Sequence, residues 1–212
     1  MKKHFQHQYR VAAEVTRLKS FGHQLIAIAF VAIVTAGCAS APAKFYTLNS
    51  TAKGDGTSAA NYAVTVGPVT IPAEVDRPQF TVSVAPNRVA VDEFNRWPAP
   101  LNDNIARVVA ADLATLLGTP RVAAGSLANF NPDYRVALDI QKFESVPGKS
   151  AQIEAVWVVR KSAGGVLLSG RTIAREPATG DYDTLAAAHS RALAKVSGDI
   201  AAAIRTEAEA KP

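Results

Sequence analysis

The sequence predicts an α+β fold, with a mixed, mostly antiparallel sheet and two amphipathic helices packed on one face of it. Short stretches alternate apolar and polar residues with a period of two, and two longer stretches repeat apolar residues with a period near 3.6. Along the chain these follow the order strands, helix, strands, helix. A helix with one apolar stripe needs a sheet face to cover, so two such helices on one face of a single sheet is the expected arrangement.

The strands expected before the first helix lie at 62–69, 80–84 and 88–92. Alternating apolar residues define the first strand, and Gly67-Pro68 and Pro72 are expected to end it. The other two are joined by Ala85-Pro86-Asn87, whose proline and asparagine suit a turn. These two strands are therefore predicted to form a hairpin.

The first helix is expected within 98–118, with Pro100 tolerated in its first turn and Gly118 placed to stop it. The second runs from about Asp183 to Glu207, with Asp183 near its N-terminus, where a carboxylate suits the helix dipole. The strands expected between the helices lie at 134–140, 153–159 and 166–174. The stretch 153–159 is apolar on both faces, which favours a central strand.

Residues 25–38 form an uncharged apolar run that ends in the only cysteine, Cys38. The run is shorter than the roughly 20 residues that a membrane span needs, and basic residues precede it, as in a cleaved signal peptide. Thr35-Ala36-Gly37-Cys38 resembles the bacterial lipobox, so residues 1–37 are expected to be removed and Cys38 to carry diacylglycerol and an N-acyl chain such as palmitate. Ala39, rather than aspartate, resembles the pattern of lipoproteins sent to the outer membrane.

The charge balance implies no strongly basic surface on the mature chain. Residues 1–37 hold 5 of the 23 basic and 1 of the 18 acidic side chains. The mature chain therefore keeps 18 basic and 17 acidic side chains. Nucleic acid is therefore not an expected partner. Residues 38–61 are expected to be the lipidated N-terminus and a flexible tether, because 49–61 is rich in Gly, Ser, Thr and Ala. Residues 62–208 are expected to form one domain, stable without disulfides.

Candidate catalytic residues are few. His189 and Ser190, with Asp181, Asp183 and Ser197, contain the groups of a nucleophilic triad, but His189 lies on the row facing the sheet while Ser190 points about 100° away. A structural histidine is the favoured interpretation. No Gly-x-Ser-x-Gly elbow is present, and the mature chain has too few histidines and cysteines for a metal site.

Two other patterns have simpler explanations than chemistry. Gly148-Lys149-Ser150 lacks the first glycine of a phosphate-binding loop and lies between two strands, so a hairpin turn is expected. The acidic pairs Glu74 with Asp76 and Asp92 with Glu93 are expected on solvated turns or strand edges. We therefore expect no catalytic residue, no metal and no cofactor other than the covalent lipid on Cys38.

Three segments, taken with the lipobox, resemble the ABC-type transport auxiliary lipoproteins, the PqiC-like family, over roughly residues 38–205. The segments are Phe45-Tyr46-Thr47-Leu48, Gly67-Pro68-Val69 leading to Val75-Asp76-Arg77-Pro78-Gln79, and Arg96-Trp97 before Leu101. The resemblance implies a non-enzymatic accessory subunit of a lipid-transport system, anchored on the periplasmic face of the outer membrane. Its implied partners are a periplasmic protein with MCE domains, an inner-membrane permease and a lipid, with homo-oligomerisation left open.

The family-signature positions are Arg77, Pro78, Trp97 and Leu101, and each has two interpretations. In the structural one, Trp97 is buried under the first helix and Arg77 fixes the turn before Pro78 through backbone carbonyls. In the other, these residues contact a partner. For the whole chain, the alternatives to a transport subunit are a purely structural envelope lipoprotein and an envelope hydrolase.

Overall fold

The computed structural model describes residues 41–54, 56, 58–165 and 167–210. The expected signal peptide and Cys38 lie outside these residues. From Pro42 onward the chain forms a single unit. Its elements are β1 (Lys44–Phe45), β2 (Val64–Thr70), β3 (Gln79–Ala85), β4 (Arg88–Arg96), α2 (Leu101–Leu117), β5 (Val122–Ala124), β6 (Tyr134–Val146), β7 (Ser150–Lys161), β8 (Leu167–Pro177) and α3 (Tyr182–Glu209).

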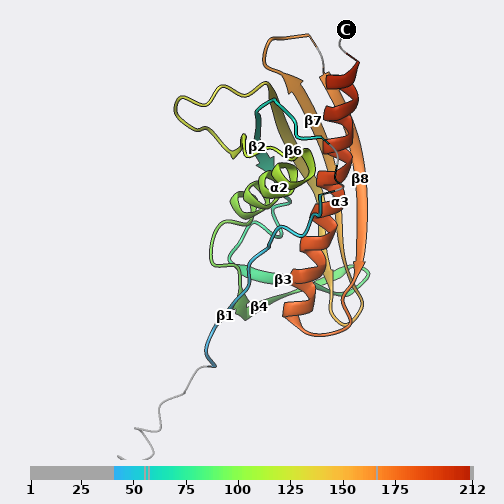
Figure 1. Ribbon diagram of the computed structural model, residues 1–212. Coiled ribbons are helices and arrows are strands. Elements are labelled where there is room, and N and C mark those ends of the chain that lie inside the picture. The colour runs from blue at the N-terminus through green and yellow to red at the C-terminus, as the bar shows by residue number, and fades with distance from the viewer. Residues whose placement is uncertain (1–40, 55, 57, 166, 211–212) are drawn as a thin grey trace, which may run out of the picture. The chain divides into compact units, whose positions relative to one another are not determined.

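The main sheet has five strands in the order β5-β2-β6-β7-β8. β2 runs parallel to β5 and β6, whereas β6, β7 and β8 are antiparallel to one another. Both helices lie on one face, with α2 over β2 and β5 and α3 over β7 and β8 (Figure 1). The predicted α+β class, with two helices on one face of a mixed sheet, is therefore confirmed.

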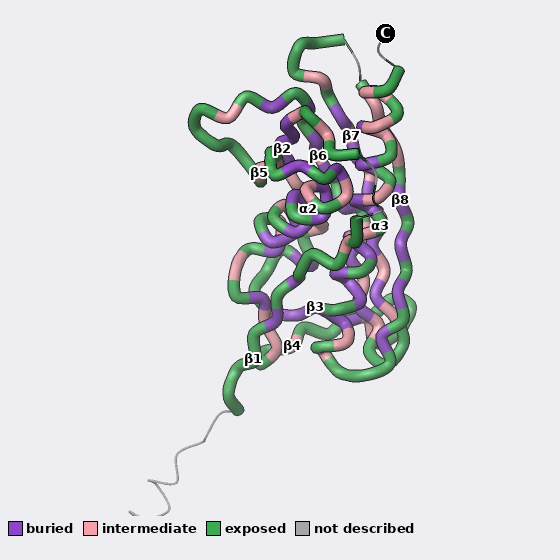
Figure 2. The backbone as a smooth tube through the Cα atoms, viewed as in Figure 1, coloured by how far each residue is buried: buried purple, intermediate pink, exposed green. Residues whose placement is uncertain are grey.

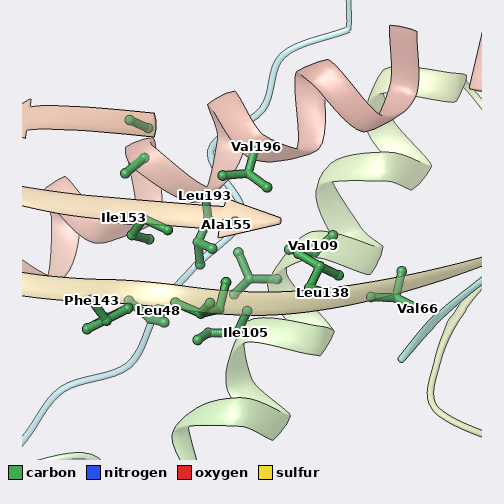
Figure 3. Close-up of a cluster of buried hydrophobic side chains, with 14 of the residues drawn as sticks. Leu48, Val66, Ile105, Val109, Leu138, Phe143, Ile153, Ala155, Leu193 and Val196 are labelled. Carbon is green, nitrogen blue, oxygen red and sulfur yellow. The ribbon is translucent and has the colours of Figure 1, made fainter. Parts of the chain in front are cut away.

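The core lies between this sheet face and the helices. Buried and partly exposed residues alternate along β7, so the tube in Figure 2 changes colour residue by residue. Side chains from both helices meet those of the strands, as Ile105, Leu193 and Ile153 do in Figure 3. Each of these three is fully buried, and burying such a side chain stabilises a fold by about 1.5–3 kcal/mol.

The helix ends agree with the predicted signals. Gly118 adopts φ of 63°, the left-handed conformation that glycine takes without a Cβ clash, and its N–H bonds the Thr115 carbonyl. Pro100, which was expected in the first turn, occupies the N-cap of α2 and so lies one position before the helix begins at Leu101. The carboxylate of Asp181 caps α3 by accepting a hydrogen bond from the Thr184 N–H.

The expectation of one sheet is wrong. The predicted hairpin, β3–β4, forms a separate three-stranded sheet in the order β1-β4-β3. The inward-facing side chains of β3, Phe80 and Val82, are buried in the domain core, and β3 contacts β6 of the main sheet without pairing with it. The sequence also gave no sign of β5, since three residues are too few to show alternation.

The first strand, expected at 62–69, is β2, but Gly67-Pro68 does not end it as expected. β2 continues through Gly67-Pro68 to Thr70. The pairing with β6 shifts register between Val66 and Val69, which leaves Pro68 outside the ladder. β5 pairs only with the first three residues of β2. Beyond Val66, no strand pairs with β2 on the β5 side, so the missing N–H of Pro68 breaks no ladder hydrogen bond there.

The flexible tether predicted up to residue 61 is wrong from residue 44 to residue 52. Tyr46 and Leu48 belong to the hydrophobic core. The Leu48 N–H donates to Asn104 Oδ1 at 2.9 Å, and the Thr51 and Ala52 N–H groups both donate to Asp112 at 3.1 Å. The folded domain therefore begins well before residue 62.

Gly170 gives a test of the packing between β7 and β8. It lies opposite Trp157, whose ring occupies the space that a Cβ at Gly170 would need, with Cζ2 the nearest atom to that position. Gly170→Ala should therefore displace the Trp157 ring and lower the free energy of unfolding by about 1–3 kcal/mol. Urea denaturation measures this. Ser169→Ala, at an exposed position of the same strand, is the control, and equal stability of both variants would contradict the packing described.

Candidate functional site

His189, the one histidine of the described chain, is sealed inside the domain. It has no exposed surface, and its ring stacks on Phe143 with centroids 3.8 Å apart and planes 8° apart. Its Nε2 forms a 2.7 Å hydrogen bond with Ser145 Oγ on β6, while Nδ1 has no partner in the described chain. A substrate cannot reach this ring, so the arrangement does not form a nucleophilic triad.

Burial also removes His189 from acid-base chemistry near neutral pH. Desolvation lowers its pKa from 6.5 to about 3, because the apolar surroundings disfavour the charged ring. Ser190 turns away, as expected, and donates to the Ala186 carbonyl while accepting from the Asn49 N–H. The structural interpretation of His189 agrees with this geometry.

The other sequence patterns occupy structural positions. Gly148-Lys149-Ser150 lies at the turn between β6 and β7, as predicted. No group of His, Cys, Asp or Glu side chains within the described ranges could hold a metal ion. No helix in the same ranges is long and apolar enough to cross a membrane.

The signature residues divide into a buried pair and an exposed pair. Trp97 and Leu101 are almost fully buried, and the Trp97 ring stacks on Phe80 with centroids 4.3 Å apart. The Trp97 N–H donates to the Pro78 carbonyl at 2.7 Å, which ties the exposed loop before β3 to the start of α2.

Arg77 differs from the structural interpretation given to it. It is exposed, and its side chain makes no hydrogen bond or ion pair with another described residue. The turn is held instead by backbone bonds, from the Val75 N–H to the Pro72 carbonyl and from the Arg77 N–H to the Val75 carbonyl. The predicted contact with backbone carbonyls is therefore wrong, and the guanidinium is free to meet a partner.

Asp92 was expected on a solvated edge, but it is partly buried and joins two elements. It accepts a hydrogen bond from Tyr182 Oη at 2.7 Å and from the N–H groups of Phe94 and Asn95. Desolvation opposes ionisation, but these hydrogen bonds outweigh it and lower the pKa of Asp92 to about 2. The same bond raises the pKa of Tyr182 to about 12, with burial as the larger cause.

A small hollow lies between the N-terminal segment and α3. Its volume is about 260 Å³, and it is lined by residues of both, among them Phe45, Asn49, Asp183 and Ser190. Its volume lies just below the range of about 300–1,000 Å³ that is typical of pockets enclosing a drug-sized ligand.

A comparison with family models shows the family of this chain. The model of the ABC-type transport auxiliary lipoprotein component matches residues 46–201, which is most of the chain. The chain belongs to the ABC-type transport auxiliary lipoprotein family. A membrane-associated location in the cell envelope follows from the family's lipoprotein character.

Solved structures share the fold of this auxiliary lipoprotein. A Xanthomonas campestris protein of the family DUF330 is 20% identical, with a TM-score of 0.64 over 75% of this chain and 93% of that one. The crystal structure of an uncharacterized protein is 17% identical, with a TM-score of 0.64 over 77% of this chain and 99% of that one. The comparison with curated proteins returned no match.

The buried His189 predicts how the stability of the domain depends on pH. Below pH 6.5 the unfolded chain binds a proton at this ring, whereas the folded chain does so only near pH 3. The free energy of unfolding should therefore decrease as the pH is lowered through this window. This group contributes up to about 1.4 kcal/mol per pH unit. Urea denaturation at pH 7.5, 5.5 and 4.5 should show a shallower decline for His189→Gln. The same decline in both proteins would contradict the assignment.

Proposed function

We propose that this chain is a non-enzymatic accessory lipoprotein of an MCE/ABC-type system that moves lipid between the inner and outer membranes. The observation that carries the proposal is the family match across residues 46–201. The inaccessibility of His189 supports the non-enzymatic part, because the most complete set of catalytic groups in the sequence depends on that ring.

The proposed location is the periplasmic face of the outer membrane. The lipobox-like ending at Cys38 and the small residue Ala39 support it. The proposed partners are a periplasmic protein with MCE domains and the inner-membrane permease. Arg77 is the proposed contact, because its unpaired guanidinium can form paired hydrogen bonds with a partner's carboxylate at little extra desolvation.

Anchoring is tested at Cys38. Cys38→Ala should abolish incorporation of radioactive palmitate and release the protein from the outer-membrane fraction, because the acyl chains supply about 0.8 kcal/mol per buried methylene. Metabolic labelling followed by membrane fractionation measures both effects. Wild-type protein that incorporates no fatty acid would end the lipoprotein proposal.

Partner binding is tested with Arg77→Ala and Trp97→Ala in affinity capture from detergent-solubilised envelopes. Arg77→Ala should retain the wild-type melting temperature and lose capture of the MCE-domain protein. Trp97→Ala should first lower steady-state abundance, because truncating a buried tryptophan costs about 3–5 kcal/mol.

The matched control is Arg107→Ala, since Arg107 is also exposed and makes no hydrogen bond or ion pair with another described residue. It should preserve both capture and stability. Unchanged capture by Arg77→Ala would remove Arg77 from the interface. A His189→Gln variant that is folded and abundant yet inactive in an envelope-permeability assay would contradict the non-enzymatic proposal and favour the hydrolase alternative.

A further inference from the structure

One surface of the three-stranded sheet is unusually apolar for a solvent-facing strand. We define it as the β4 apolar face, made of residues from β1 and β4. Their exposed fractions are 63% for Phe45, 55% for Val89, 39% for Val91 and 46% for Phe94. Exposed apolar groups gathered in this way, rather than scattered singly, mark an interaction site.

These residues share a face because their neighbours point inward. Tyr46 and Asn95 are joined on the inner side by a 2.7 Å hydrogen bond, which directs Phe45 and Phe94 outward. Asp92 bonds Tyr182 on α3, so Val91 before it also faces outward. Val89 is placed on the same side by the alternation of a strand, since the next residue, Ala90, pairs with the buried Val82, although Ala90 itself is exposed.

The length of chain between Cys38 and the domain limits how far this face can lie from the lipid on Cys38. Phe45 is seven residues after Cys38, and an extended chain spans at most about 3.6 Å per residue. Phe45 therefore stays within about 25 Å of a lipidated Cys38, whatever path the intervening residues follow. In Figure 1 the described chain begins beside β1, at the end of the domain where β3 and β4 lie.

The charges beside the face suit a phospholipid surface. Lys44 and Arg88 are exposed, and neither side chain makes a hydrogen bond or ion pair with another described residue. Arg96 is paired with the nearby acid Glu93 at 3.5 Å. Aromatic and aliphatic groups flanked by unpaired cations are the composition that settles at a bilayer interface containing anionic lipid.

We propose that the β4 apolar face rests in the interfacial layer of the bilayer that holds the lipid on Cys38. The inference rests on the proposed function, because it requires an acylated Cys38. The contact gives the domain a fixed orientation on the membrane, with the loop between β5 and β6 directed away from the lipid. A second copy of the chain or a periplasmic protein on the same face would be a different arrangement, and the test separates them.

The test uses spin labels on the full lipoprotein, reconstituted into vesicles of phosphatidylethanolamine and phosphatidylglycerol. Because Cys38 is the only native cysteine and its thiol is acylated, Phe94→Cys and Val91→Cys each provide one labelled position. Leu127→Cys is the control, since Leu127 is 59% exposed in the loop between β5 and β6. Collision rates with oxygen, which concentrates in lipid, and with a nickel chelate, which stays in water, report the surroundings of each label.

Labels at 91 and 94 should collide more often with oxygen than with nickel, and the label at 127 should show the reverse. Nickel accessibility at 91 and 94 equal to that at 127 would overturn the proposal. Spin–spin broadening, or labels at 91 and 94 shielded from both reagents, would also overturn it by showing a second copy or another protein on the face. Label uptake by the wild-type protein would reveal a free Cys38 and would refute the lipoprotein proposal together with this inference.

Discussion

The buried carboxylate of Asp112 is the constraint on which the domain depends. It lies on α2 with no exposed surface and accepts hydrogen bonds from Ser50 Oγ, from the Thr51 and Ala52 N–H groups and from Ser197 Oγ on α3. A buried carboxylate is costly unless donors surround it. Satisfying Asp112 therefore requires α2, α3 and the N-terminal segment to be in place together, which makes the segment part of the fold.

A second constraint joins the smaller sheet to the rest. Phe80 contacts Tyr46, Trp97 and Tyr182 with ring centroids 4.3–5.9 Å apart. Its neighbours come from the N-terminal segment, the entry to α2 and the start of α3, so one strand of the hairpin is fixed by three distant parts of the chain. The outer side of β4 has no such cover, and its apolar residues remain exposed for the contact proposed with the membrane.

Two polar groups that the sequence singles out, His189 and Asp92, join parts of the fold. His189 completes a stack with Phe143, and Asp92 joins the hairpin to α3 through Tyr182. In a sequence such groups resemble catalytic residues. In the structure Asp92 is hydrogen-bonded to Tyr182, and His189 is buried away from solvent. Arg77, by contrast, is exposed and its side chain makes no hydrogen bond or ion pair with another described residue, which is why it is the contact proposed for a partner.

The sequence by itself determined the α+β class, both helices, the hairpin and the inward position of His189, because these follow from local periodicity and from turn and stop signals near each element. The family could also be inferred from short segments such as Val75-Asp76-Arg77-Pro78-Gln79. Tertiary structure alone decided the division into two sheets, the ordering of residues 44–52 and the exposure of Arg77. Each of these depends on partners distant in the chain, as Ser50 and Asp112 are, and no local pattern specifies which buried group a segment of small polar residues will meet.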